Sequence, residues 1–123
     1  MDRDRLYELA LEEVKGTLAA LPAPLREQAK QVPLTFEARP NSSQRQDGIE
    51  PDALGLFVGP EFADEKNATV PLPPQIIFFL DNLWEQAEKD EELFRKEVHT
   101  TFLHELGHYL GLDEEGLAER GLE

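Results

Sequence analysis

The chain of 123 residues has no cysteine, one methionine and one tryptophan. Without cysteine the protein can form no disulfide, and a zinc site built from thiolates is excluded. The first residues alternate acidic and basic side chains, and no apolar run of the kind found in a secretory signal follows them. These absences favour a reducing compartment, so we expect a cytoplasmic protein.

Positive charge and long apolar runs are also scarce. Lysine and arginine total 12 against 26 aspartates and glutamates, which gives a net charge of −14. Such an excess of negative charge opposes binding to nucleic-acid phosphates and to anionic membranes. The longest apolar run, residues 76–80, is much too short to span a bilayer. We therefore expect no nucleic-acid or membrane partner, and the sequence leaves the oligomeric state open.

Two of the three histidines lie in one motif. The run His104-Glu105-Leu106-Gly107-His108 has the pattern H-E-x-x-H. On an α-helix, residues four apart share a face, so both imidazoles could bind one Zn²⁺ at about 2.0–2.1 Å. Glu105 lies one step round the helix, where it could act on a metal-bound water as general base. The motif predicts one zinc ion and metal-assisted hydrolysis.

The sequence around the motif indicates a helix on independent grounds. No proline occurs between residues 91 and 110, and apolar side chains recur there every three or four positions. Asp90 is a suitable N-cap, and Gly111 falls where a left-handed residue would end the helix. The third histidine, His99, would lie on the opposite side from His108, so we expect it to be a structural or a surface residue.

The remaining segments predict an α+β protein with a single domain over residues 1–123. Periodic apolar residues predict an N-terminal helix over 3–21, and Pro24 would open a short helix over 25–31. Apolar alternation and short apolar runs predict three strands, at residues 32–39, 54–58 and 75–80.

The connecting segments are more polar. Residues 39–53 predict a loop that is long for a compact domain. Asp81 could cap a turn of helix that carries Trp84, which we expect in the core. The expected fold is therefore α+β, with a small sheet packed against the motif helix.

A catalytic zinc ion usually has three protein ligands, so the two histidines leave one to be found. Only residues 109–123 follow the motif, which leaves little room for a ligand from a second downstream helix. Glu114 stands where the extended motif H-E-x-x-H-x-x-G-x-x-H/D places its third ligand. Asp113, one residue earlier, is the alternative. We favour Glu114, because the turn at Gly111 determines how far the following residues extend back toward the metal.

These residues resemble the small zincin-like metallopeptidases that have a minimal zincin fold. The segment Leu54-Gly55-Leu56-Phe57-Val58-Gly59-Pro60 is similar to the central strand and turn of that family, and Pro74-Gln75-Ile76-Ile77-Phe78-Phe79 is similar to its next strand. The run from Glu97 to His108 resembles its active-site helix. The likeness covers most of the chain.

The resemblance implies a mixed sheet of three or four strands on an active-site helix. It also implies zinc ligands at His104, His108 and the acidic Glu114 position, with Glu105 as base. Two departures stand out: the family more often has aspartate at the third-ligand position, and the methionine turn of the larger metzincins is missing, since Met1 is the only methionine.

We therefore expect a zinc metallopeptidase that acts on a peptide or protein substrate. The alternative is a non-catalytic module of the same fold, which would bind metal or another protein. Metal affinity and peptide hydrolysis separate the two possibilities.

Overall fold

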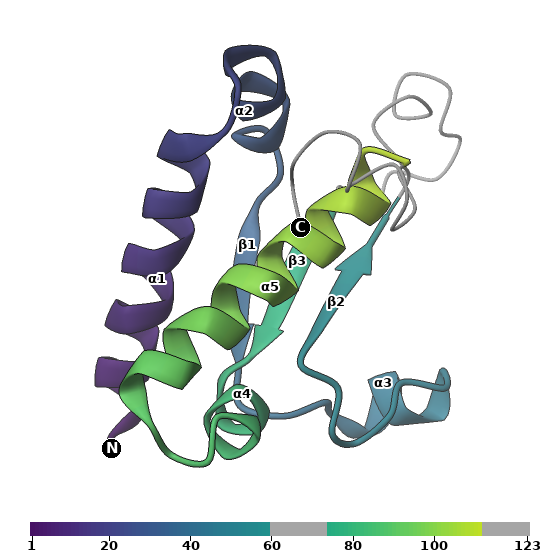
Figure 1. Ribbon diagram of the computed structural model, residues 1–123. Helices are drawn as coiled ribbons and strands as arrows, with labels where there is room; N and C mark the ends of the chain where they lie inside the picture. Colours follow the sequence, from purple (N-terminus) through teal and green to yellow (C-terminus); the bar gives the residue numbers. More distant parts are fainter. Residues whose placement is uncertain (60–73, 112–123) are drawn as a thin grey trace.

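The structure is a computed structural model, and it describes residues 1–59 and 74–111 (Figure 1). Within these ranges, the chain forms one three-stranded sheet and five helices. The elements in chain order are α1 (Arg3–Ala20), α2 (Ala23–Ala29), β1 (Leu34–Glu37), α3 (Ser42–Gln46), β2 (Gly55–Val58), β3 (Gln75–Phe79), α4 (Leu80–Gln86) and α5 (Glu91–Tyr109). None of the helices in the described ranges is both long and apolar enough to cross a membrane.

The sheet is mixed, with strand order β1-β3-β2. Strand β1 pairs with β3 in parallel, with Leu34 opposite Ile76, whereas β2 pairs with β3 in antiparallel fashion, with Gly55 opposite Phe78. The most apolar strand, β3, is therefore central, where both edges are covered by backbone hydrogen bonds. This arrangement confirms the expected α+β fold with a small mixed sheet and an N-terminal helix.

Helix α5 crosses one face of the sheet, and α1 lies beside it (Figure 1). The interface is apolar: Phe78 of β3 and Phe94, Phe102 and Leu106 of α5 are almost fully buried in one core. Burial of this much apolar surface is what holds an amphipathic helix against a sheet. Trp84, which was expected in the core, is only partly buried: it packs edge-on against the buried Phe94 at the margin of the core, with ring centroids 5.8 Å apart.

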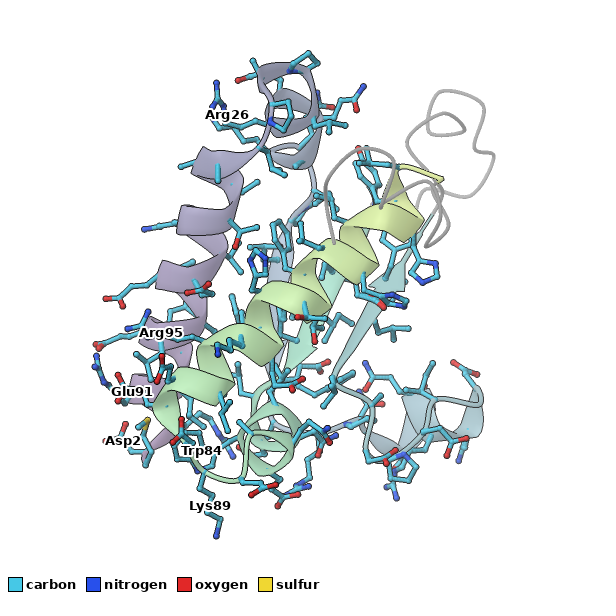
Figure 2. The ribbon with its side chains drawn as sticks, in the orientation of Figure 1. Asp2, Arg26, Trp84, Lys89, Glu91 and Arg95 are labelled. Atoms are coloured by element: carbon cyan, nitrogen blue, oxygen red, sulfur yellow. The ribbon has the colours of Figure 1, made fainter. Side chains whose placement is uncertain are left out.

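Polar contacts fix α1 against the first half of α5. Figure 2 shows Arg95 near the start of α5, on the side of α1. Its guanidinium is 3.0 Å from the carboxylate of Glu12 and 3.9 Å from that of Glu13, both on α1. Farther along, Thr17 Oγ1 and His99 Nδ1 are 2.8 Å apart. His99 thus connects the two helices, which agrees with the first of the two expectations for it, a structural role.

The predicted long loop at residues 39–53 is wrong in part, because it contains helix α3. Asn41 accepts a hydrogen bond from the Gln44 backbone N–H, and the Gln44 side chain accepts one from the Asn41 backbone N–H. This reciprocal capping box starts the helix, and asparagine followed three residues later by glutamine is its sequence signal.

The predicted cap at Asp81 is also wrong. Helix α4 starts at Leu80 directly after strand β3, so Asp81 is already inside its first turn. The Asp81 N–H donates to the Ala38 carbonyl instead. Helix α2 begins at Ala23 rather than residue 25, with Pro24 as its second residue, a position where the missing N–H has no helical partner to lose.

Candidate metal centre

Helix α5 presents the H-E-x-x-H residues close to its C-terminal end. Its start is fixed by Asp90, whose Oδ1 accepts a hydrogen bond of 2.9 Å from the Leu93 N–H. It ends at Tyr109, and Gly111 follows with a φ of +73°. Both predicted ends of the helix are therefore confirmed, and the motif lies within its last two turns.

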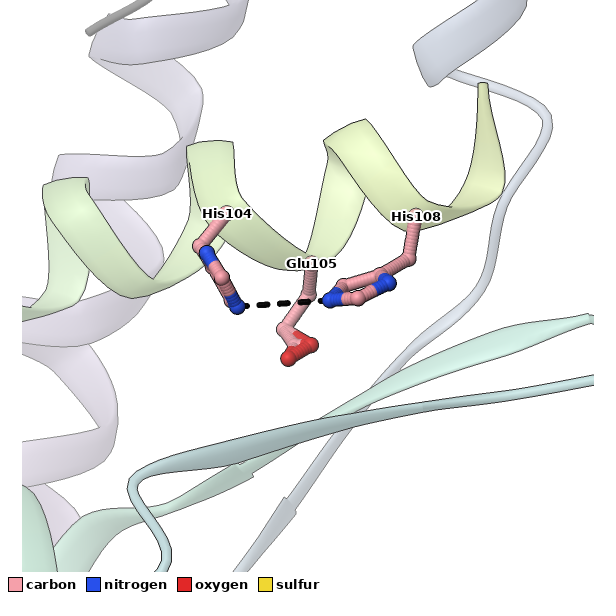
Figure 3. Close-up of side chains that lie close together, drawn as sticks. All are labelled: His104, Glu105 and His108. Carbon is pink, nitrogen blue, oxygen red and sulfur yellow. Dashed lines mark hydrogen bonds between the residues drawn. The ribbon is translucent and has the colours of Figure 1, made fainter. Parts of the chain in front are cut away.

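The imidazoles of His104 and His108 point toward one another from successive turns of α5 (Figure 3). Their Nε2 atoms are 3.3 Å apart, and their ring planes lie at 80° to each other. Both side chains are exposed at the surface of the helix. One ring can donate a hydrogen bond to the other across this distance, which holds the pair in a convergent orientation.

The separation also fits a shared zinc ion. Two nitrogens bound to one tetrahedral Zn²⁺ at about 2.05 Å lie roughly 3.3 Å apart. The two Nε2 atoms of His104 and His108 have this separation without any rearrangement. Neutral imidazole is also a preferred zinc ligand. The residues present therefore fit the metal that the motif predicts.

Glu105 lies between the two histidines but turns toward the sheet, where it is 7% exposed. One of its carboxylate oxygens and one nitrogen of each imidazole lie within 4.8 Å of one another. Its Oε2 is buried and has no hydrogen-bond partner within the described part of the chain. Buried carboxylate oxygens are normally satisfied, so this one is free for an incoming polar group.

The environment of Glu105 changes its proton affinity. Burial raises the pKa of Glu105 above its ordinary value, while His108 and His104 lower it to a smaller extent. A carboxylate with a raised pKa takes up a proton more readily than one in water. The geometry and the electrostatics at Glu105 therefore both suit proton transfer beside the paired imidazoles.

Strand β2 forms the opposite wall of the site. A β-carbon added to Gly55 would lie 2.5 Å from Thr101 Cγ2 and 3.5 Å from Glu105 Cγ, so only glycine allows this approach. Residues 53–55 and the facing side of α5 line an open pocket of about 340 Å³ that includes His104 and Glu105. A group bound in this pocket would therefore contact His104 and Glu105 together.

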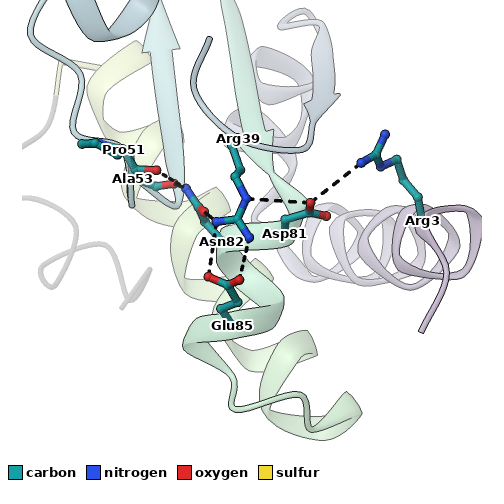
Figure 4. Close-up of polar contacts among 7 residues, drawn as sticks. All are labelled: Arg3, Arg39, Pro51, Ala53, Asp81, Asn82 and Glu85. Atoms are coloured by element: carbon teal, nitrogen blue, oxygen red, sulfur yellow. Dashed lines mark hydrogen bonds and ion pairs between the residues drawn. The ribbon is translucent and has the colours of Figure 1, made fainter. Parts of the chain in front are cut away.

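A buried amide holds the segment that leads into β2. Asn82 is 4% exposed, and its Nδ2 donates hydrogen bonds of 2.8 Å to the Pro51 and Ala53 carbonyls (Figure 4). Its Oδ1 accepts a hydrogen bond of 2.8 Å from Arg39, which also pairs with Glu85. This network, which starts on α4, fixes the rim of the pocket.

The sequence predictions singled out some of these residues and missed others. The structure brings His104, Glu105 and His108 together. The predicted third ligand Glu114 and its alternative Asp113 lie outside the described residues. Gly55 and Asn82 were missed as contributors to the site. A glycine within a strand pattern is a signal of close backbone approach, whereas no local signal marks an asparagine that bonds a distant loop.

Comparison with known proteins agrees with this geometry. No curated protein matches the chain. A sequence model of the zincin-like metallopeptidases matches residues 29–122, a stretch that includes all three strands, helix α5 and the paired imidazoles. Because the match covers well over half of the sequence, the chain belongs to the zincin-like metallopeptidase family.

Proposed function

We propose that this protein is a zinc-dependent endopeptidase. In this proposal His104 and His108 bind the ion, Glu114 is the third protein ligand with Asp113 as the alternative, and Glu105 is the general base. The observation that carries the proposal is the Nε2–Nε2 distance of 3.3 Å, which matches two ligands of one tetrahedral ion.

A bound zinc ion would supply Lewis acidity, which lowers the pKa of water and polarises a peptide carbonyl. Glu105 then has two tasks. It removes a proton from the water whose oxygen attacks the carbonyl carbon, and it delivers that proton to the amide nitrogen as the C–N bond breaks. Its burial and its Oε2, which has no hydrogen-bond partner among the described residues, support both tasks.

The sheet offers a place for an extended substrate. Among the described strands, β2 pairs with β3 alone, so its other edge can add a peptide strand through backbone hydrogen bonds. The start of this strand, at Gly55, lies against Glu105. A peptide bound along β2 would therefore pass beside the general base and the paired imidazoles.

The test combines zinc binding with peptide hydrolysis. Zinc-loaded wild-type protein is expected to hydrolyse members of a broad peptide library. The Glu105→Gln variant should bind zinc but lose activity by about 10²–10⁴-fold, the usual contribution of a general base. Glu92→Gln is a matched control, because Glu92 is an exposed residue of the same helix and the change removes the same charge.

Two results would contradict the proposal. Equal rates for the wild type and Glu105→Gln would show that Glu105 is not the base. Zinc affinity that His108→Ala leaves unchanged, together with no hydrolysis by the wild type, would favour a non-catalytic module instead.

A further inference from the structure

The pocket beside the paired imidazoles contains a second carboxylate, from Glu97, that the proposed chemistry does not use. Glu97 is half-buried and lines the same pocket as His104 and Glu105. It lies seven and eight residues before them, so the three side chains project from one face of the helix. Thr100 and Thr101, which lie between Glu97 and His104 in the chain, line the pocket as well.

Glu97 lines the pocket without a cation beside it, whereas two other acidic residues near it on α1 and α5 are paired. Glu91 of the same helix and Glu12 of α1 lie within 4.0 and 3.0 Å of Arg95. No hydrogen bond or ion pair joins Glu97 to any residue in the described ranges. A half-buried carboxylate without a partner is less well solvated than one in water, so it gains from a cation brought by a ligand.

The other surfaces of the pocket suit a long aliphatic stem. Ala53 and Leu54 form part of the facing wall, and the Thr101 methyl group points toward Gly55 across it. Lysine and arginine combine an apolar stem with a charged end, so they place methylene groups on apolar surface and the charge on a carboxylate. A neutral or acidic side chain would leave Glu97 uncompensated.

We propose that Glu97 selects substrates with a lysine or arginine within two residues of the cleaved bond. This inference rests on the proposed peptidase function and names its substrate class. Eight residues of helix put Glu97 about 12 Å along the axis from Glu105. Two residues of extended peptide cover about 6–7 Å of this distance, and the flexible basic side chain spans the rest. The selected residue therefore lies within two positions of the bond.

Binding and cleavage are measured separately. Fluorescent peptides that differ only in one residue, lysine, norleucine or glutamate, are titrated into zinc-loaded Glu105→Gln protein, which should not cut them. Lysine peptides should bind about tenfold more tightly than norleucine peptides, as expected for one charge-assisted contact in a partly buried site. Adding Glu97→Gln should remove this preference, and Glu97→Lys should favour the glutamate peptide.

The matched control is Glu92→Gln in the same background, which lowers the net negative charge equally but lies outside the pocket. It should leave the lysine preference unchanged. Circular dichroism and zinc content of each variant establish that the fold and the site are intact. The corresponding cleavage rates are measured with Glu105 restored.

The outcomes separate this inference from the peptidase proposal. Cleavage without a basic preference, a preference that survives Glu97→Gln, or no peptide binding would overturn the role of Glu97. Lysine peptides that bind through Glu97 but are never cut by the wild type would support the pocket and overturn the peptidase function.

Discussion

Gly55 of β2 faces Thr101 of α5 so closely that a β-carbon on Gly55 would lie 2.5 Å from Thr101 Cγ2. It would also lie 3.2 Å from the Ile77 carbonyl oxygen. The strand therefore has little room to move away from the helix without disturbing its pairing with β3. This contact brings the start of β2 beside Glu105, and both Gly55 and Glu105 line the pocket.

Gly55→Ala should destabilise the protein by about 1–3 kcal/mol, because an added methyl group overpacks a tight contact. Chemical denaturation in urea measures the change. Thr101→Ser removes Cγ2 and keeps the hydroxyl, so it should recover part of the loss in the double variant. Gly16→Ala is the control: its β-carbon would meet nothing within 4 Å, and it should stabilise α1 by up to about 1 kcal/mol. Additive effects of Gly55→Ala and Thr101→Ser would show that the two residues are not in contact.

Asn82→Asp should cost about 2–3 kcal/mol of folding free energy. The change replaces a donor with a carboxylate oxygen that faces the Pro51 and Ala53 carbonyls, so two hydrogen bonds are lost. Because these bonds fix the pocket rim, peptide affinity should also fall. Asn41→Asp is the matched control, since the Asn41 side chain only accepts a bond at the exposed start of α3. A loss as large at Asn41 as at Asn82 would argue against the buried amide as the cause.

Zinc should raise the thermal midpoint of the wild type. A ligand that binds only the folded state contributes about 2.7 kcal/mol at a concentration one hundred times its dissociation constant. His104→Ala or His108→Ala should abolish most of this shift, and both side chains are exposed, so the metal-free fold should change little. His99→Gln is the control, because His99 contacts Thr17 rather than the paired imidazoles. A zinc shift that is lost equally in His99→Gln would contradict the site.

Thr17→Val should destabilise the packing of α1 on α5 by about 1 kcal/mol. The hydroxyl of Thr17 is 2.9 Å from the Glu13 carbonyl and 2.8 Å from His99 Nδ1, and valine keeps the shape but loses both contacts. Urea denaturation is the measurement. Thr100→Val, at an exposed position of α5, should change stability by less than about 0.5 kcal/mol. Equal costs at both positions would show that the link to His99 adds nothing.

Local signals in the sequence predicted most of the helices and the convergence of the motif. Asp90 and Gly111 bound α5 through contacts within a few residues, and the spacing of His104 and His108 places both on one face of any helix. Helix α3 was missed even though its capping box is equally local. Its polar composition is typical of a loop, and composition alone does not distinguish a loop from a short exposed helix.

Two features of the site depend on residues far apart in the chain. Asn82 bonds carbonyls some thirty positions earlier. Gly55 approaches a helix that lies beyond β3 and α4. The hydrogen bonds of Asn82 have no local signal in the sequence. The close approach of Gly55 is indicated only by a glycine within a strand pattern. The hydrophobic periodicity of the sequence indicates which face of a helix or strand is apolar. It does not indicate which distant residue will make a contact, or how close the two residues will be.

The sequence by itself determined the α+β class, the ends of the motif helix and the shared face of its two imidazoles, because helix geometry fixes side-chain direction over one turn. Only the tertiary structure decided that β3 is central, that β1 runs parallel and β2 antiparallel to it, and that Gly55 lies against Thr101 and Glu105. Those choices come from burying the apolar faces of distant segments together, a balance of packing and hydrogen bonding that no short stretch of the chain contains.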